Sequence, residues 1–225
     1  MYQFEDDSLM LQNDLYQINM AESYWNDGIH ERMAVFDLYF RSMPFNGGYA
    51  VFNGLKRVID FMDNFGFSDT DIEYLRSIGY QDDFLDYLKN LKFTGHIHSM
   101  QEGEICFGNE PLMRVEAPLI QAQLLETVLL NIINFHTLIA TKASRIRQIA
   151  NDDILMEFGT RRGQELDAAL WGARAAYIGG FNSTSNVRAG KLFGIPVSGT
   201  HAHALVQTYG DEYIAFKKYA ERHKD

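Results

Sequence analysis

The chain has 225 residues, 46% of them hydrophobic, which is enough to bury the core of one domain or of two small ones. Its formal net charge of −10 argues against general binding to nucleic acids or anionic membranes, because the long-range field repels both. The single cysteine, Cys106, excludes an intramolecular disulfide framework. The acidic start MYQFEDDS lacks the basic and apolar regions of a signal peptide, so a cytoplasmic protein is expected.

The first predicted helix begins at Asn13 or Asp14, both good capping residues, and ends near Gly28. Tyr16 lies in its first turn, and the residue pattern alone favours a core position for this side chain. The apolar face of the helix is expected to contain Leu15, Ile18, Ala21 and Trp25.

The residues after this helix predict a mixture of strands and helices. His96 and His98 alternate with apolar neighbours and therefore face one side of a strand. They are expected to be surface residues, the alternative being two metal ligands for which no third ligand lies nearby in the sequence. The expected elements are a strand at 33–40, a loop at 41–48, helices at 50–65, 69–78 and 81–91, and strands within 93–115.

A long helical pattern covers residues 119–149 and is expected to break once near His136 and Thr137. Polar residues interrupt its apolar run, so a buried core helix is expected rather than a membrane span. After it, Asp152 and Asp153 precede a strand. An acidic pair that served a phosphate-binding loop would follow a strand, so these two aspartates are interpreted as a solvated turn.

We predict a domain boundary near Pro118. Residues 1–117 would form an amino-terminal α+β domain, and residues 118–225 would begin an α/β barrel domain that is incomplete. The barrel is predicted because residues 154–206 contain three successive units, each made of a strand, a polar loop and a helix. Such units are typical of parallel strands with crossover helices. The three strands are expected at 154–158, 176–181 and 195–197.

The polar loops of these units share one chemistry. Arg161 and Arg162 offer guanidinium groups to a phosphate or carboxylate. The loop 183–186 opens a helix, where hydroxyl and backbone N–H groups bind anions. Thr200 and His203 lie at the next helix start, where the helix dipole is expected to favour a neutral, nucleophilic imidazole. In parallel sheets such loops meet at one edge, so the sequence predicts a phosphate-handling pocket that contains a histidine.

Four motifs in order make this chain resemble the nicotinate phosphoribosyltransferase family. They are NDLYQ (13–17), EFGTRRGQ (157–164), GGFNSTSNV (179–187) and GTHAH (199–203). The resemblance runs from about residue 8 to the end. It implies an α/β fold in which an amino-terminal α+β domain precedes the first βα units of an irregular, TIM-like barrel.

The resemblance also implies a reaction. Members of the family join nicotinate to 5-phosphoribosyl-1-pyrophosphate (PRPP), form nicotinate mononucleotide and release pyrophosphate, as a salvage step of NAD biosynthesis. They hydrolyse ATP through a phosphorylated histidine, use Mg²⁺ with ATP and PRPP, and hold no tightly bound organic cofactor. Homodimers with shared active sites are implied, with small molecules as ligands and neither nucleic acid nor membrane.

Individual positions match the family's functional residues. The phosphohistidine falls on His203, not His201. Phe158 and the partner subunit's tyrosine at the position of Tyr16 would stack on the two faces of the pyridine ring, and Arg161 would lie near the phosphates. Ser185 stands where nicotinamide-using relatives carry an aspartate, so it favours nicotinate, whose carboxylate an aspartate would repel. The remaining substrate-binding positions are Gly159, Ser183 and Thr200.

Two alternatives remain open at this stage. A metal-dependent barrel hydrolase would use His201 and His203 as ligands, although further ligands on later strands are not visible. An inactive fragment that only folds or binds is the other alternative, because family members are about twice as long as this chain. The ending on a helix predicts that the barrel is cut before it closes, and that the chain by itself is not a competent enzyme.

Overall fold

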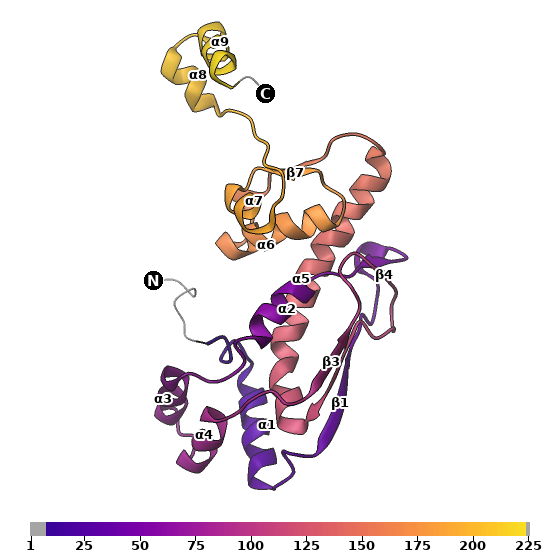
Figure 1. Cartoon of the computed structure of the whole chain (residues 1–225), viewed down its shortest axis with the longest axis vertical. Coiled ribbons are helices and arrows are strands. Elements are labelled where there is room, and N and C mark those ends of the chain that lie inside the picture. The colour runs from indigo at the N-terminus through magenta and orange to yellow at the C-terminus, as the bar shows by residue number, and fades with distance from the viewer. Residues whose placement is uncertain (1–7, 224–225) are drawn as a thin grey trace.

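The computed structural model describes residues 8–223; the acidic residues 1–7 used in the signal-peptide argument lie outside this range. The chain contains both helices and strands (Figure 1). In chain order the elements are α1 (Leu15–Asn26), β1 (Met33–Leu38), η2 (Pro44–Asn46), β2 (Ala50–Val51), α2 (Leu55–Met62), α3 (Asp69–Ser77), α4 (Asp82–Lys89), β3 (His96–Ser99), β4 (Ile105–Cys106), β5 (Met113–Pro118), α5 (Leu119–Ala150), β6 (Met156–Glu157), η3 (Thr160–Arg162), α6 (Glu165–Ile178), β7 (Ser183–Thr184), α7 (Val187–Phe193), α8 (His203–Tyr209) and α9 (Glu212–Arg222).

The principal sheet is antiparallel, with strand order β1-β5-β3. The alternation that predicted β1 is confirmed, because Ala34, Phe36 and Leu38 are the more buried positions of the strand. On β3, His96 and His98 are exposed, as expected for surface residues. The sheet packs against α5 through β1 and β5, and α5 runs beside the strands in Figure 1.

The predicted helices are present, with two corrections. Leu15 was expected on the apolar face of α1, but its side chain is 62% exposed; Ile18 and Ala21, expected on the same face, are buried. The helix predicted from residue 50 begins only at Leu55, because Ala50 and Val51 pair with β4 as strand β2. Here strand pairing prevails over an amphipathic pattern that equally suits a helix.

The predicted break in the long helix is wrong: α5 is continuous over 32 residues. His136 and Thr137 are compatible with this helix because the His136 Nδ1 atom and the Thr137 hydroxyl both have partners. The Nδ1 atom of His136 lies 2.7 Å from the Ile132 carbonyl oxygen, and the Thr137 hydroxyl donates to the Asn53 carbonyl at 3.2 Å. Although α5 is long and apolar enough to cross a bilayer, half of its most apolar window is buried inside the protein, as in a core helix.

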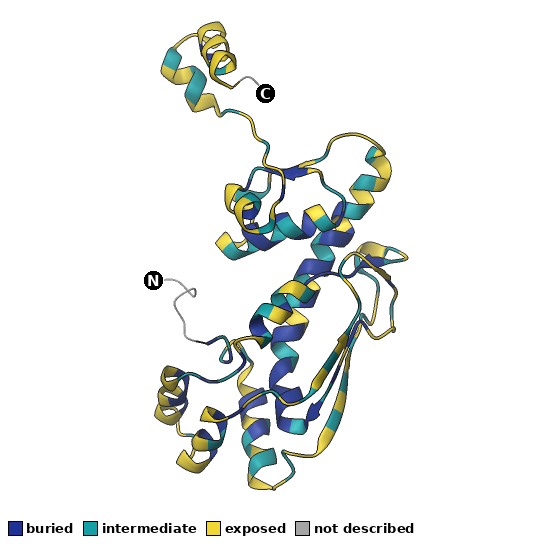
Figure 2. Ribbon diagram, in the orientation of Figure 1, coloured by how far each residue is buried: buried dark blue, intermediate teal, exposed yellow. Residues whose placement is uncertain are grey.

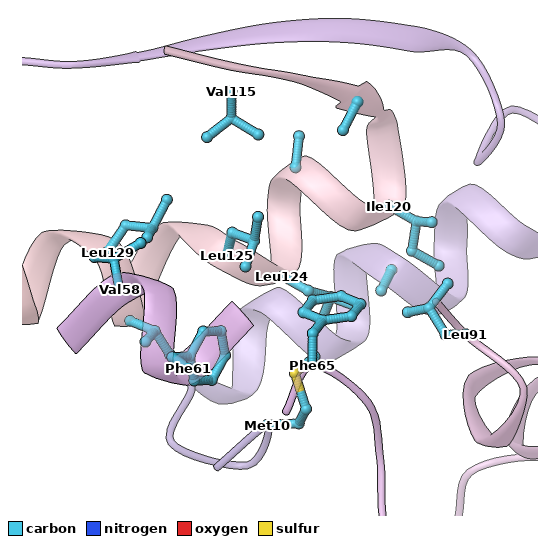
Figure 3. Close-up of a cluster of buried hydrophobic side chains, with 14 of the residues drawn as sticks. Met10, Val58, Phe61, Phe65, Leu91, Val115, Ile120, Leu124, Leu125 and Leu129 are labelled. Atoms are coloured by element: carbon cyan, nitrogen blue, oxygen red, sulfur yellow. The ribbon is translucent and has the colours of Figure 1, made fainter. Parts of the chain in front are cut away.

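One core joins α1, α2, the sheet and the first half of α5 (Figures 2 and 3). Ile120, Leu124 and Leu125 of α5 belong to the same cluster as Phe61 and Phe65, and this cluster extends from Met10 to Ile133. We call residues 8–133 the amino-terminal body. Residues of α5 up to Ile133 belong to this core, so the core extends beyond the boundary predicted near Pro118. The division into two domains at that residue stays a prediction.

Residues 154–223, which we call the carboxyl-terminal segment, begin with parallel strands. β6 pairs with β7, and Thr184 forms a parallel bridge with Val197. The predicted strand at 176–181 is wrong, because α6 continues to Ile178 and the strand follows the turn at Gly179 and Gly180. The described residues do not form a closed barrel, and α8 with α9 stand apart from the rest (Figure 1).

A largely buried ion pair joins the amino-terminal body to the carboxyl-terminal segment. Arg174 of α6 makes two hydrogen bonds to the Glu102 carboxylate, at 2.6 and 3.0 Å, and both side chains are about 15% exposed. Glu102 also accepts hydrogen bonds from the backbone N–H groups of Gly54 and Lys56 at the start of α2. The carboxylate thus links α2 to α6, and its partners satisfy most of its lone pairs.

Candidate functional site

The first loop of the predicted site follows β6. Phe158 is 40% exposed directly after the strand, and Arg161 and Arg162 are exposed in the short helix η3. Within the described residues, neither guanidinium group has an ion pair or a side-chain hydrogen bond. Both cations are therefore available to an anion from solution.

The second loop, after β7, lies beside the first. Ser183 is buried, and its hydroxyl has no hydrogen-bond partner within residues 8–223; Ser185 is half-buried. Asn186 begins α7 as its cap, because its side chain accepts a hydrogen bond of 3.0 Å from the Ala189 N–H. The backbone N–H of Ser185 donates to the Glu157 carbonyl at 2.9 Å, so the two loops share a fixed register.

Glu157 holds both loops, and sequence reasoning missed this residue. One carboxylate oxygen accepts from the backbone N–H of Gly159, and the other accepts from the Thr184 hydroxyl at 2.7 Å. The signal was present in the sequence as one acidic residue inside an apolar strand, where an unpaired carboxylate is costly. Gly159 allows this arrangement, because a Cβ at this position would lie 2.5 Å from a Glu157 oxygen.

The two histidines of the third loop differ in their surroundings. The His201 ring packs against Phe216 and Tyr219, with centroid separations of 4.9 and 5.6 Å, and its Nδ1 is buried. His203 is exposed at the first position of α8, and Thr200 is exposed before it. Of the pair, His203 is the imidazole that a substrate can reach.

The structure does not bring all predicted site residues together. It places Phe158, Arg161 and Ser185 in loops that follow the paired strands β6 and β7, with Ser183 in β7 itself. In contrast, α8 with His203 stands away from these loops, and α1, which carries Tyr16, lies toward the opposite end of the molecule (Figure 1). Tyr16 is 50% exposed, not in the core position that the pattern alone favoured. Desolvation, followed by the charges of Glu126 and Asp14, raises the pKa of the Tyr16 hydroxyl, so this hydroxyl stays protonated.

The arrangement does not suit a metal-dependent hydrolase. Residues 8–223 contain no cluster of three or more side chains placed to hold a metal ion. His201 is also engaged by the aromatic residues of α9, not by a second ligand. Mg²⁺ is therefore considered only together with the phosphates of a substrate.

Known proteins resemble the chain over most of its length. Residues 11–134 match the N-terminal domain of nicotinate phosphoribosyltransferase. The chain is 65% identical to nicotinate phosphoribosyltransferase of Bacillus subtilis over all 225 residues, which are 46% of that protein. It is 47% identical over 203 residues to nicotinate phosphoribosyltransferase 2 of Arabidopsis thaliana, covering 88% of this chain and 36% of that one.

Solved structures of related enzymes also match the chain over most of its length. The crystal structure of human nicotinic acid phosphoribosyltransferase matches with a TM-score of 0.82 and 39% identity, over 87% of this chain and 40% of that one. A nicotinate-nucleotide pyrophosphorylase from Pyrococcus furiosus shares the fold with a TM-score of 0.79 at 24% identity, over 98% of this chain and 50% of that one. The chain thus spans about half the length of the relatives that it matches, as a mixed α/β structure.

Proposed function

Because the chain belongs to the nicotinate phosphoribosyltransferase family, we propose that it supplies the amino-terminal part of an enzyme that makes nicotinate mononucleotide from nicotinate and PRPP. The observation that carries the proposal is the pair of loops after β6 and β7. They present an exposed aromatic ring, serine hydroxyls and two cations that have no ion pair within residues 8–223, at the carboxyl edge of parallel strands. A cytoplasmic location is part of the proposal.

The two loops divide the recognition of the substrates. Phe158 stacks on one face of the pyridine ring, Arg161 neutralises phosphate charge, and Ser185 donates to the nicotinate carboxylate. A neutral hydroxyl suits this ligand, because an acidic side chain in its place would repel it. Ser183 and the Gly159 backbone complete the pocket, and Glu157 keeps the two loops in register through its bonds to Gly159 and Thr184. Positioning and charge stabilisation carry most of the catalysis in such a displacement.

His203 is the residue that we propose to be phosphorylated by ATP. Its exposure lets the imidazole attack a phosphoryl group, while His201 is held by Phe216 and Tyr219. Thr200, which is also exposed, hydrogen-bonds substrate. Mg²⁺ arrives with the phosphates of ATP and PRPP and offsets their charge.

The site is proposed to be shared between two subunits. Tyr16 is half-exposed on α1, distant from the strand loops of its own chain (Figure 1), which suits a ring that serves the neighbouring subunit. With residues 1–117 as an amino-terminal domain and 118–225 as the start of the barrel, one subunit's α1 would cover the other's loops.

The function is tested by joining this chain to the remaining part of the Bacillus subtilis relative, in place of the segment that it matches. The chimera is expected to form nicotinate mononucleotide with ATP hydrolysis. His203→Ala should abolish the phosphoenzyme and the coupled hydrolysis, whereas His201→Ala should leave both largely intact. Acid-labile phosphate that maps to His201 would reverse the assignment.

A separate experiment tests the shared site. Mixing chimeras that carry Tyr16→Ala with chimeras that carry His203→Ala should restore part of the activity through hybrid sites. A mixture with verified heterodimers and no restored activity would contradict the sharing. The 225-residue chain assayed alone is expected to form no product, because the described strands leave an open sheet.

A further inference from the structure

The side chain of Arg147, in the last turn of α5, joins the segments that lead into β6 and β7. Its Nη1 donates to the carbonyl oxygens of Asn151 and Asp153, at 2.7 and 2.8 Å. Its Nε donates to the Gly180 carbonyl at 2.8 Å, and its Nη2 donates to the Asn182 side-chain oxygen at 2.6 Å. The first two acceptors precede β6 and the other two precede β7, so one side chain holds the approach to both strands.

Asn182 extends this contact to the start of β6. Its side-chain oxygen also accepts from the Leu155 N–H at 2.8 Å, and its own N–H donates to the Leu155 carbonyl at 2.8 Å. The Arg147 guanidinium and the Leu155 N–H can only donate, so the oxygen of the Asn182 amide must face them. Because Met156 pairs with Ser183, the contact between Leu155 and Asn182 continues the register of β6 with β7 by one residue.

The aliphatic stem of Arg147 fits the turn before β7. Gly180 has a φ of +104°, which residues with a side chain rarely adopt, and a Cβ there would lie 3.0 Å from the Arg147 Cγ. The stem therefore packs directly on the backbone of the turn, which fixes the direction of the guanidinium group.

The register of these two strands needs such support because each strand is only two residues long. At their carboxyl ends Glu157 bonds to both loops, and Arg147 acts at their amino ends. Phe158 directly follows β6, and Ser185 directly follows β7. A shift of one strand along the other would therefore move this ring and this hydroxyl apart.

The geometry of the donors, not the charge of Arg147, is what these contacts use. Its four acceptors are three carbonyl oxygens and one amide oxygen, and it has no ion pair within residues 8–223. A lysine would supply one ammonium point in place of a planar fork, and it could not meet acceptors on several segments at once.

We propose that Arg147 is a positioning residue, which fixes β6 against β7 and thereby holds Phe158 and Ser185 at the spacing that one ligand requires. The inference rests on the proposed function where it concerns nicotinate; the register itself rests on the hydrogen bonds alone. Within the described residues Arg147 makes no bond to the loop of His203, so its effect is confined to the first two loops.

Amide exchange in the 225-residue chain tests the register. Arg147→Lys is expected to speed exchange of the Asn182 N–H about tenfold or more, because its bond to Leu155 opens when the guanidinium contacts are lost. The N–H of Leu112, which donates to the Leu38 carbonyl at 2.8 Å in the amino-terminal body, should exchange at an unchanged rate.

Arg145→Lys is the matched control on the same helix. The Nη1 atom of Arg145 donates to the Phe45 carbonyl at 3.1 Å, in the amino-terminal body and not in a segment that leads into β6 or β7. Its substitution should change exchange at Asn182 by less than about twofold.

Kinetics of the chimera with the Bacillus subtilis part test the consequence for binding. Arg147→Lys should raise the KM for nicotinate about tenfold, because Phe158 and Ser185 no longer meet the ligand together. Phosphorylation of His203 by ATP should change by less than about twofold, since Arg147 holds no part of that loop. A variant that only lost stability would lower kcat and phosphorylation together, through a smaller folded fraction, and leave the KM unchanged.

The outcomes separate this inference from the proposed function. An unchanged exchange rate at Asn182, or equal acceleration at Leu112, would overturn the role of Arg147 in the register. Faster exchange at Asn182 with an unchanged KM for nicotinate in an active chimera would overturn its role in binding. If the unsubstituted chimera forms no nicotinate mononucleotide, the proposed function fails, while the exchange rates still decide whether Arg147 fixes the strands.

Discussion

The amino-terminal body and the carboxyl-terminal segment bury their apolar side chains to different extents. In the body, Phe52, Phe84 and Leu124 are fully buried in one large cluster. In the segment, Leu170, Ala173, Ala189 and Ile195 form a small separate cluster, while Ile154 and Val187 are each 71% exposed. The body is stabilised by its own core, whereas the segment depends on its contacts with α5 and on the ion pair to Glu102.

The difference in burial between the two regions indicates what stabilises the site loops. The loops after β6 and β7 rest on the segment, whose own apolar burial is small. Their position relative to the body is set by α6, which packs along the second half of α5 and pairs through Arg174 with Glu102. Changes at this junction should therefore disturb the loops more than changes on the exposed face of the segment.

The largest effect is expected from Glu102→Ala. It leaves the largely buried guanidinium of Arg174 without its carboxylate partner and removes one acceptor from the backbone N–H groups of Gly54 and Lys56 at the start of α2. Loss of one partner of a buried pair costs about 3–5 kcal/mol of unfolding free energy, measurable by urea denaturation. Arg76→Ala is the control: it breaks the exposed pair with Asp82 and should cost less than about 1 kcal/mol. Equal losses would show that the junction pair is not special.

A core substitution comes next. Leu124→Ala removes a fully buried side chain from the amino-terminal body and should reduce the unfolding free energy by about 2–5 kcal/mol. Leu192→Ala, at a position 52% exposed in the segment, should change it by less than about 0.5 kcal/mol. If the Leu192 variant were the less stable of the two, the comparison between the regions would be reversed.

The contact between α5 and α6 gives a smaller effect. A Cβ at Gly179 would collide with the Ala140 carbonyl oxygen and lie 2.6 Å from the Ala143 Cβ. Gly179→Ala therefore forces the two helices apart and should cost about 1–3 kcal/mol in thermal unfolding. Gly48→Ala has open space around it and should be nearly neutral. An unchanged Tm for Gly179→Ala would mean that α5 and α6 can move apart without loss of stability.

Much of this organisation was predictable from sequence. The order of the elements, the polar loops after the strands, and the exposure of His96, His98 and the turn at Asp152 all follow from patterning and turn chemistry. The motifs identified the family, which the comparison with known proteins confirms. The roles given to individual site residues stay predictions.

The errors occurred where long-range contacts prevail over local pattern. Residues 50–54 have a helical pattern, but Ala50 and Val51 find a strand partner more than 50 residues later. A break was predicted near Thr137 because a polar residue inside an apolar helix needs a hydrogen-bond partner, and the partner, the Asn53 carbonyl, is far away in the sequence. Glu157 was missed because its role depends on Thr184, on another strand. Pairings of this kind are not encoded in any short window of sequence.

The smallest expected effect is a pH dependence that originates in α5, where the body meets the segment. Burial lowers the pKa of His136 below its usual value, so the unfolded chain binds a proton at a higher pH than the folded one. Stability is therefore present above the unfolded pKa, about 6.5, and declines as the pH falls from there toward the folded pKa. Chemical denaturation between pH 8 and the onset of acid unfolding should show this decline in the native chain, and His136→Phe, which keeps the aromatic contact with Trp171, should flatten it. An identical slope in both proteins would assign the pH dependence to other groups and leave His136 without a role in it.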